Sequence, residues 1–252
     1  MTFQTLEYLI FLPLTFILYW TLCRGNKTLQ NGLIVIASLI FYGWWDWRFL
    51  GLLLLTAFST FFAGDLMGKT EDPKKRKLIS IGAILLNLGI LFFFKYFNFF
   101  VQAFIDAFSL FGADVEVSTL NILLPVGISF YTFSALSYSI DVYQKKVEPA
   151  KDILAYLAYV MFFPSILSGP ISRAQKTLPQ YFESRSFNYD VAVAACKAIL
   201  IGAVMKLCLA DRLAIYVNTV YSNIDQHNGT TLLFTSILYT LQIYADFAGY
   251  SL

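Results

Sequence analysis

The chain has 252 residues, of which 58% are hydrophobic, 18% aromatic and 13% charged, and its formal net charge is +2. A soluble domain carries roughly a quarter charged residues, so this composition excludes a soluble globular protein and indicates an integral membrane protein in contact with lipid. The small net charge gives no reason to expect nucleic acid as a partner.

Long uncharged runs recur along the chain. Most of them approach the roughly 17–25 residues that an α-helix needs to cross a bilayer. We therefore predict an all-α fold, a polytopic transmembrane helix bundle that forms a single domain over residues 1–252. The uncharged runs cover residues 8–23, 28–45, 49–64, 78–94, 117–140, 153–172 and 228–245.

The basic residues predict the orientation of the first helices, because cytoplasmic loops carry an excess of lysine and arginine. Arg24 and Lys27 lie in the first loop, and residues 67–77 hold a dense group of lysines with one arginine. The loop between them, Trp44–Arg48, is short and nearly neutral. We predict a multi-pass protein of the inner (plasma) membrane, with its N-terminus outside and both basic loops in the cytoplasm.

An aromatic stretch follows Lys95, with phenylalanines at helical spacing and polar residues between them. Such a stretch either lies along the outer face of the membrane as an amphipathic segment or continues the preceding helix as one long tilted helix. The sequence leaves both open. The phenylalanines are Phe97, Phe100, Phe104, Phe108 and Phe111.

Residues 117–143 are predicted to cross back toward Lys145 and Lys146, which we expect in the cytoplasm. Small hydroxyl side chains lie within this uncharged span, and Ser129 and Thr132 are the two candidate residues for a substrate path. Such residues either hold transmembrane helices together or line a substrate path, and both interpretations stand.

Proline and glycine then interrupt an apolar run at Pro164, Gly169 and Pro170. A full crossing would place Arg173 outside, against the positive-inside rule, so we predict a broken or re-entrant segment near 164–173. Irregular backbone is tolerated at membrane depth where it is buried in protein or lines a wet cavity, which makes Pro170 a candidate for the working interior. Arg173 either holds an anionic donor group or extends to the membrane interface.

Residues 190–222 are predicted to be helical, and a polar loop with His227 follows. A histidine between Gln226 and Asn228 is typical of a solvated surface residue. The three cysteines lack the spacing of a metal site, so no metal is predicted.

The last uncharged run contains a carboxylate, Asp246. On a helix, Gln242, Asp246 and Tyr250 share one face at positions i, i+4 and i+8. A charge near the middle of a transmembrane helix costs roughly 2.5–3.5 kcal/mol on insertion scales, so Asp246 is expected to face the bundle interior with Gln242 and Tyr250 as its nearest partners. The pattern fits a polar patch beside a substrate path and a structural hydrogen-bond network equally well.

Four stretches match known motifs in the order in which they occur. They are FYGWWDWRFL (41–50), LLPVGISFYTFSALSYSIDVY (123–143), FFPSILSGPISRA (162–174) and QIYADFAGYS (242–251), and KLCLADRL (206–213) fits as well. Together they resemble the membrane-bound O-acyltransferases of the bacterial alginate O-acetyltransferase type. The chain looks like the N-terminal half of such a protein.

The resemblance implies a helix bundle around a funnel, without a bound cofactor. It implies an acyl donor, such as acetyl-CoA or an acyl carrier, that arrives from the cytoplasm. It implies a glycan hydroxyl outside the cell or in the periplasm as acceptor, and other envelope acetylation proteins as candidate partners. The predicted activity is therefore membrane O-acyl transfer, in which an exported, alginate-like polysaccharide or a cell-wall glycan is O-acetylated.

The family's catalytic base is a membrane-embedded histidine that follows the "FAGYSD"-type motif by several tens of residues. Here Leu252 stands where an aspartate usually continues that motif, and His227 precedes the motif. No residue of this chain is therefore assigned as catalytic, the histidine is expected beyond Leu252, and the 252-residue chain by itself is expected to be inactive.

Two other functions remain as alternatives. A non-catalytic scaffold subunit of an envelope-polymer complex is favoured by the lack of a suitable histidine. A transporter is less favoured, because transporters of this size often contain paired broken helices in two related halves. The sequence shows one broken element and no internal repeat.

Overall fold

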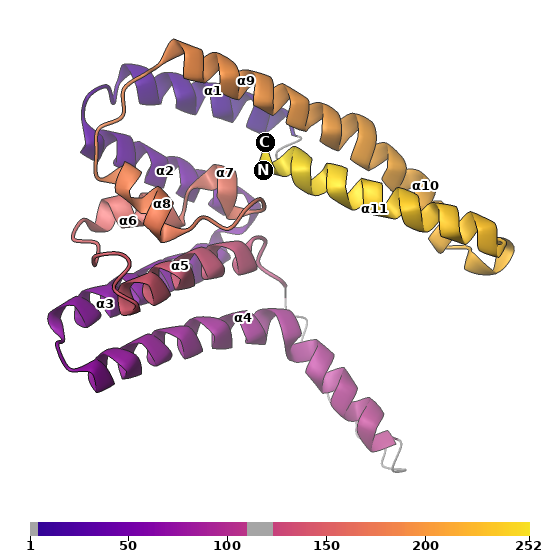
Figure 1. Cartoon of the computed structure of the whole chain (residues 1–252), viewed down its shortest axis with the longest axis horizontal. Coiled ribbons are helices and arrows are strands. Elements are labelled where there is room, and N and C mark those ends of the chain that lie inside the picture. The colour runs from indigo at the N-terminus through magenta and orange to yellow at the C-terminus, as the bar shows by residue number, and fades with distance from the viewer. Residues whose placement is uncertain (1–4, 110–122) are drawn as a thin grey trace. The chain divides into compact units, whose positions relative to one another are not determined.

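The computed structural model describes residues 5–109 and 123–252, which form helices joined by turns and loops and include no strand (Figure 1). The all-α prediction is confirmed for this part of the chain. Contacts between Cα atoms divide the chain into two compact units. Unit 1 comprises Met1–Leu167 and Ile171–Ser186, and unit 2 comprises Ser168–Pro170 and Phe187–Leu252. The single domain over 1–252 stays a prediction.

Three stretches of the described residues are long and apolar enough to cross a membrane. They are Lys27–Lys69, Pro73–Ile105 and Tyr189–Tyr221. A shorter apolar helix, Leu6–Thr21, precedes them. These lengths and compositions confirm the prediction of a helical membrane protein.

Unit 1 contains five helices of at least sixteen residues and a set of short ones near its end. The long helices are α1 (Leu6–Thr21), α2 (Lys27–Asp46), α3 (Leu50–Lys69), α4 (Pro73–Ser109) and α5 (Ile128–Tyr143). The short elements are η1 (Trp47–Phe49), α6 (Ile153–Val160), α7 (Phe163–Ile166), α8 (Ala174–Thr177) and η2 (Leu178–Tyr181).

The aromatic stretch after Lys95 continues the preceding helix. α4 runs without interruption from Pro73 to Ser109, and Figure 1 shows that it bends along its course. Four of the phenylalanines named above therefore lie on the same helix as residues 78–94: Phe97, Phe100, Phe104 and Phe108. Phe111 lies outside the described residues.

Residues 117–143 are predicted to cross the membrane, and the structure shows that residues 123–127 of this segment differ from the helix expected of a crossing. This part is not helical, and α5 begins only at Ile128. The reason is local: Pro125 restricts the residue before it, and Gly127 adopts a left-handed φ of +74° that ends any helix preceding it. Residues 117–122 lie outside the described part of the chain.

The predicted break near 164–173 is confirmed. α6 ends at Val160, the four-residue α7 follows, and the backbone from Leu167 to Arg173 is not helical. Side chains of unit 1 satisfy the interrupted backbone. The N–H of Phe163 donates to Ser38 Oγ at 3.1 Å, and the Tyr159 hydroxyl donates to the carbonyl of Ser172 at 2.8 Å. Such pairing is what irregular backbone needs at membrane depth. A re-entrant path through the membrane stays a prediction.

Unit 2 is built around a helix pair that Figure 1 shows side by side. The predicted helical region 190–222 is confirmed, although it contains a π-helical turn in the middle. The elements are α9 (Tyr189–Val204), the π turn η3 (Met205–Ala210), α10 (Asp211–Tyr221), η4 (Ile224–Gln226) and α11 (Gly229–Ser251).

Candidate functional site

The three polar residues predicted to share a face all lie on α11. Because Gly229–Ser251 is one continuous α-helix, Gln242, Asp246 and Tyr250 follow one another at intervals of four residues. The helix contains no other ionisable acid or base besides the tyrosines, which leaves Asp246 as its one carboxylate among the described residues. These three residues form a polar stripe along one face of α11.

The ionic partner of Asp246 is Lys206, which sequence reasoning did not connect to it. The Lys206 Nζ lies 2.5 Å from Asp246 Oδ1 and 3.0 Å from Asp211 Oδ1. The same ammonium lies 5.7 Å from the centre of the Tyr250 ring, within the range of a cation–π contact. The expectation that Gln242 and Tyr250 would be the nearest partners is thus incomplete, because a lysine from the neighbouring helix supplies the counter-charge.

The π turn explains how one lysine meets two carboxylates. In an α-helix of 3.6 residues per turn, residues five apart point in different directions. In a π turn the hydrogen bonds run from i to i+5, so Lys206 and Asp211 come onto a common face. The spacing of these two charges within KLCLADRL is the sequence signal that could have indicated this arrangement.

Two glycines bring Lys206 close to α11. A Cβ added to Gly249 would lie 2.8 Å from the carbonyl oxygen of Gly202 and 3.1 Å from the backbone nitrogen of Lys206. A Cβ added to Gly202 would lie 2.5 Å from the carbonyl oxygen of Gly249. The two backbones are therefore in direct contact, as small residues permit in membrane helix pairs. This contact places the Lys206 side chain one turn from Asp246.

The predicted residue Pro170 belongs to the short segment of unit 2 that precedes α9. Its neighbour Gly169 has a φ of +105°, and a Cβ there would lie 3.9 Å from the carbonyl oxygen of Tyr250. The segment 168–170 therefore lies against the C-terminal end of α11. Pro170 itself is exposed.

Two polar atoms of unit 2 have no protein partner. Ser168 Oγ and Gln242 Oε1 are buried and make no hydrogen bond within the described residues. Buried polar atoms in native proteins are nearly always paired with protein, water or ligand. Each of these two atoms could therefore bind water or a hydroxyl group of a ligand.

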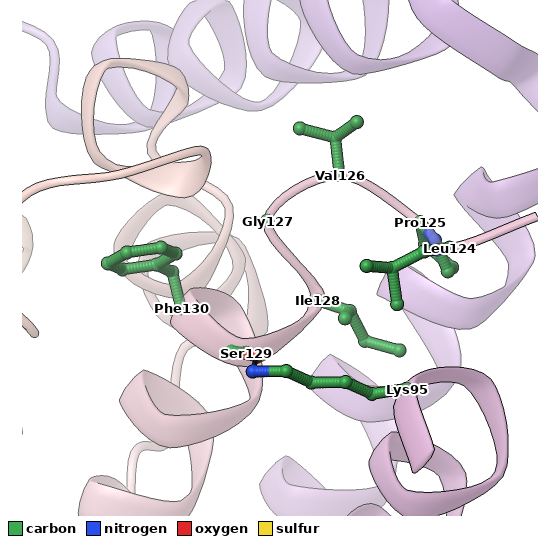
Figure 2. Close-up of a pocket in the computed structure, with 8 residues that line it drawn as sticks. All are labelled: Lys95, Leu124, Pro125, Val126, Gly127, Ile128, Ser129 and Phe130. Atoms are coloured by element: carbon green, nitrogen blue, oxygen red, sulfur yellow. Dashed lines mark hydrogen bonds between the residues drawn. The ribbon is translucent and has the colours of Figure 1, made fainter. Parts of the chain in front are cut away.

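Ser129 and Thr132 lie in unit 1, on the first turns of α5. Figure 2 shows Ser129 beside Lys95, whose ammonium donates to Ser129 Oγ at 3.5 Å. Ser129 and Lys95 line an open, mostly apolar pocket of about 250 Å³ together with Leu124–Ile128 and Phe130. Thr132 is fully buried, and its hydroxyl oxygen has no hydrogen-bond partner among the described residues.

Arg173 lies at the N-cap position of α8 in unit 1 and is exposed. No ion pair forms between it and any described residue. Its role in holding an anionic donor group stays a prediction.

A polar cluster at the first turn of α2 was not predicted. The amide of Gln30 donates to the carbonyl of Arg185 at 2.8 Å and accepts from its N–H at 2.9 Å. The Arg185 guanidinium donates to Asn31 Oδ1 and lies over the ring of Tyr181 at 5.1 Å. Burial raises the pKa of the Tyr181 phenol, while Arg185 lowers it in part, so the phenol stays neutral. The cluster fixes the chain after the broken segment to α2.

His227 lies between η4 and α11, as predicted for a loop residue. Its backbone N–H donates to the carbonyl of Ile224 at 3.1 Å, and the following Asn228 caps α11. Nothing in this setting orients the imidazole toward a reacting group.

Comparison with known proteins gives matches along nearly the whole chain. The chain is 32% identical over 246 residues to a probable alginate O-acetylase of Pseudomonas putida, a match that covers 96% of the chain and 49% of that protein. It is 33% identical over 244 residues to the probable alginate O-acetylase of Pseudomonas aeruginosa, covering 96% of the chain and 46% of that protein. A peptidoglycan O-acetyltransferase of Helicobacter pylori is 26% identical over 268 residues, a match that covers 95% of the chain and 50% of that protein.

The chain thus spans about half the length of the curated relatives that it matches. No protein-family model matches it. The relatives nevertheless agree with the motifs, since both the alginate and the peptidoglycan enzymes are of one type and match through their N-terminal half. Over nearly its whole length the chain is therefore similar to the N-terminal half of the alginate O-acetylases, which are membrane-bound O-acyltransferases.

Proposed function

We propose that the protein is a membrane O-acyltransferase that acetylates hydroxyl groups of an exported polysaccharide. The observation that carries this proposal is the match over 96% of the chain to proteins named as alginate O-acetylases. The identity to these relatives is 32–33%, against 26% to the peptidoglycan enzyme. An alginate-like polysaccharide is therefore favoured over a cell-wall glycan as acceptor.

The proposed reaction transfers an acyl group from a donor, such as acetyl-CoA or an acyl carrier, that reaches the protein from the cytoplasm. The acceptor oxygen attacks the acyl carbonyl carbon and forms the ester bond, while the bond from that carbon to the donor breaks. A general base takes the hydroxyl proton, and the leaving group of the donor receives it. No cofactor is needed for this exchange.

We assign the base to a histidine in the part of the relatives that this chain does not match, and not to His227. The described residues of this chain would contribute the path of the substrates. The stripe of Gln242, Asp246 and Tyr250 would line it, with Pro170 beside it. The unpaired buried oxygen of Gln242 supports this assignment, since it would accept a hydrogen bond from a hydroxyl group.

The proposed setting is the inner membrane, with the N-terminus outside and both basic loops in the cytoplasm. Arg173 would then hold an anionic group of the donor. The acceptor would be reached from the outer or periplasmic side, where other acetylation proteins of the envelope would cooperate.

The proposal is tested by deleting the gene and measuring ester-linked acetate. Mild base releases this acetate separately from the exported polysaccharide and from the peptidoglycan. We expect the polysaccharide fraction to lose its acetate and the restored gene to return it. Loss confined to peptidoglycan would reassign the acceptor, and unchanged acetate in both fractions would contradict the proposed activity.

A further inference from the structure

The ion pair between Lys206 and Asp246 leaves part of the carboxylate accessible. The Lys206 side chain is 22% exposed, whereas that of Asp246 is 46% exposed. The contact to lysine is made through Oδ1. The second oxygen of Asp246 is therefore free to accept a hydrogen bond from a bound molecule, while the first is held in place by the ammonium.

Lysine suits a position between two carboxylates. Its ammonium is a compact point charge with three donors, so it can contact Asp211 and Asp246 at the same time. Asp211, at the start of α10, forms an ion pair with Lys206 in the preceding π turn. Lys206 in turn forms an ion pair with Asp246 on α11. The ammonium thereby compensates the charge of Asp246.

The helix pair has a second contact besides this ion pair. The direct backbone contact between Gly202 and Gly249 already joins α9 to α11. The π turn, by contrast, interrupts the α-helical hydrogen bonds at the residue that carries the ammonium. π turns of a single turn occur frequently at functional sites. The local distortion is therefore best explained by the placement of Lys206.

We propose that Lys206 is a positioning residue, which holds the carboxylate of Asp246 so that its second oxygen accepts a hydrogen bond from a hydroxyl of the acceptor glycan. This inference rests on the proposed function and adds a residue to it. The ligand class is a polyhydroxylated sugar, because the stripe offers acceptors in Asp246 and Gln242 to a molecule that is rich in O–H donors.

The test introduces single substitutions into the native gene and measures ester-linked acetate on the exported polysaccharide. We expect Lys206→Met to lower acetylation about 10–100-fold at an unchanged amount of protein in the membrane, as a misplaced positioning group does. Lys206→Arg should restore part of it, because the positive charge returns although the compact ammonium does not. The matched control is Lys197→Met on α9, an exposed lysine, which should leave acetylation unchanged.

Full acetylation by Lys206→Met would overturn the inference, and so would equal losses in the Met and Arg variants accompanied by loss of protein from the membrane. A second measurement keeps the two proposals separate. The thermal unfolding of the purified protein is compared for Lys206→Met, Asp246→Asn and the double variant, and non-additive effects are expected. If the wild type acetylates nothing, the proposed function fails, while additive effects in this cycle overturn the ion pair on which the inference stands.

Discussion

At the scale of single residues, Gly127 shows how strongly the backbone constrains the start of α5. It has a φ of +74°, and a Cβ there would collide with the carbonyl oxygen of Ile166 at the end of α7. Gly127→Ala is expected to destabilise the protein by about 1–3 kcal/mol through backbone strain, with a further cost for moving Ile166. The loss of stability is measured as a lower midpoint temperature of thermal unfolding in detergent.

The matched control for Gly127→Ala is Gly51→Ala in α3. A Cβ at Gly51 meets nothing within 4 Å, and alanine favours helix. This variant should unfold at the wild-type temperature or slightly above it. Equal midpoints for the Gly127 and Gly51 variants would show that the contact with Ile166 does not constrain the fold.

Sequence reasoning identified Asp246 and failed to identify its partner for a physical reason. A carboxylate within an apolar run can be recognised directly in the sequence. The interval of four residues then places Gln242 and Tyr250 on the same helix face. The contact with Lys206 depends on a π turn and on the meeting of Gly202 with Gly249, forty-odd residues apart. Neither follows from a periodic pattern.

At the scale of elements, the contact between α9 and α11 positions the whole polar stripe. Gly249→Ala would place a methyl group 2.8 Å from the carbonyl of Gly202, so the helices must separate. We expect a loss of about 1–3 kcal/mol from overpacking. Because the shift also separates Lys206 from Asp246, acetylation should fall with it.

Gly229→Ala on the same helix is the control for this contact, since a Cβ at Gly229 meets nothing within 4 Å. Thermal unfolding and ester-linked acetate are measured for both variants. A Gly249→Ala protein that keeps both wild-type values would refute the close helix contact.

The same scale shows where prediction of the helices succeeded. The long apolar runs gave α2, α3 and α4, because length and composition are sufficient for a membrane helix. The last run gave the helix α11. They misplaced the start of α5, since uncharged composition does not distinguish helix from the irregular backbone around Pro125 and Gly127. The break after α6 was predictable from its prolines and glycine, whereas its hydrogen bond to Ser38 was not.

At the scale of the whole molecule, the orientation in the membrane remains to be measured. The basic residues of 67–77 predict that this loop is cytoplasmic and that the Trp44–Arg48 turn is outside. In a cysteine-free protein, a thiol reagent that does not cross membranes should label Asp46→Cys in intact cells and should label Glu71→Cys only after permeabilisation. The reverse labelling pattern would invert the topology.

The central proposal has two parts: the protein acetylates a polysaccharide, and Asp246 is required for that activity. The most direct measurement compares ester-linked acetate on the polysaccharide from a deletion strain that carries either the wild-type gene or Asp246→Asn, at equal amounts of protein in the membrane. Asparagine keeps the shape but removes the charge that pairs with Lys206 at 2.5 Å. The account predicts full acetylation with the wild type and a fall of about 10–100-fold with the variant. Full acetylation by Asp246→Asn would contradict it.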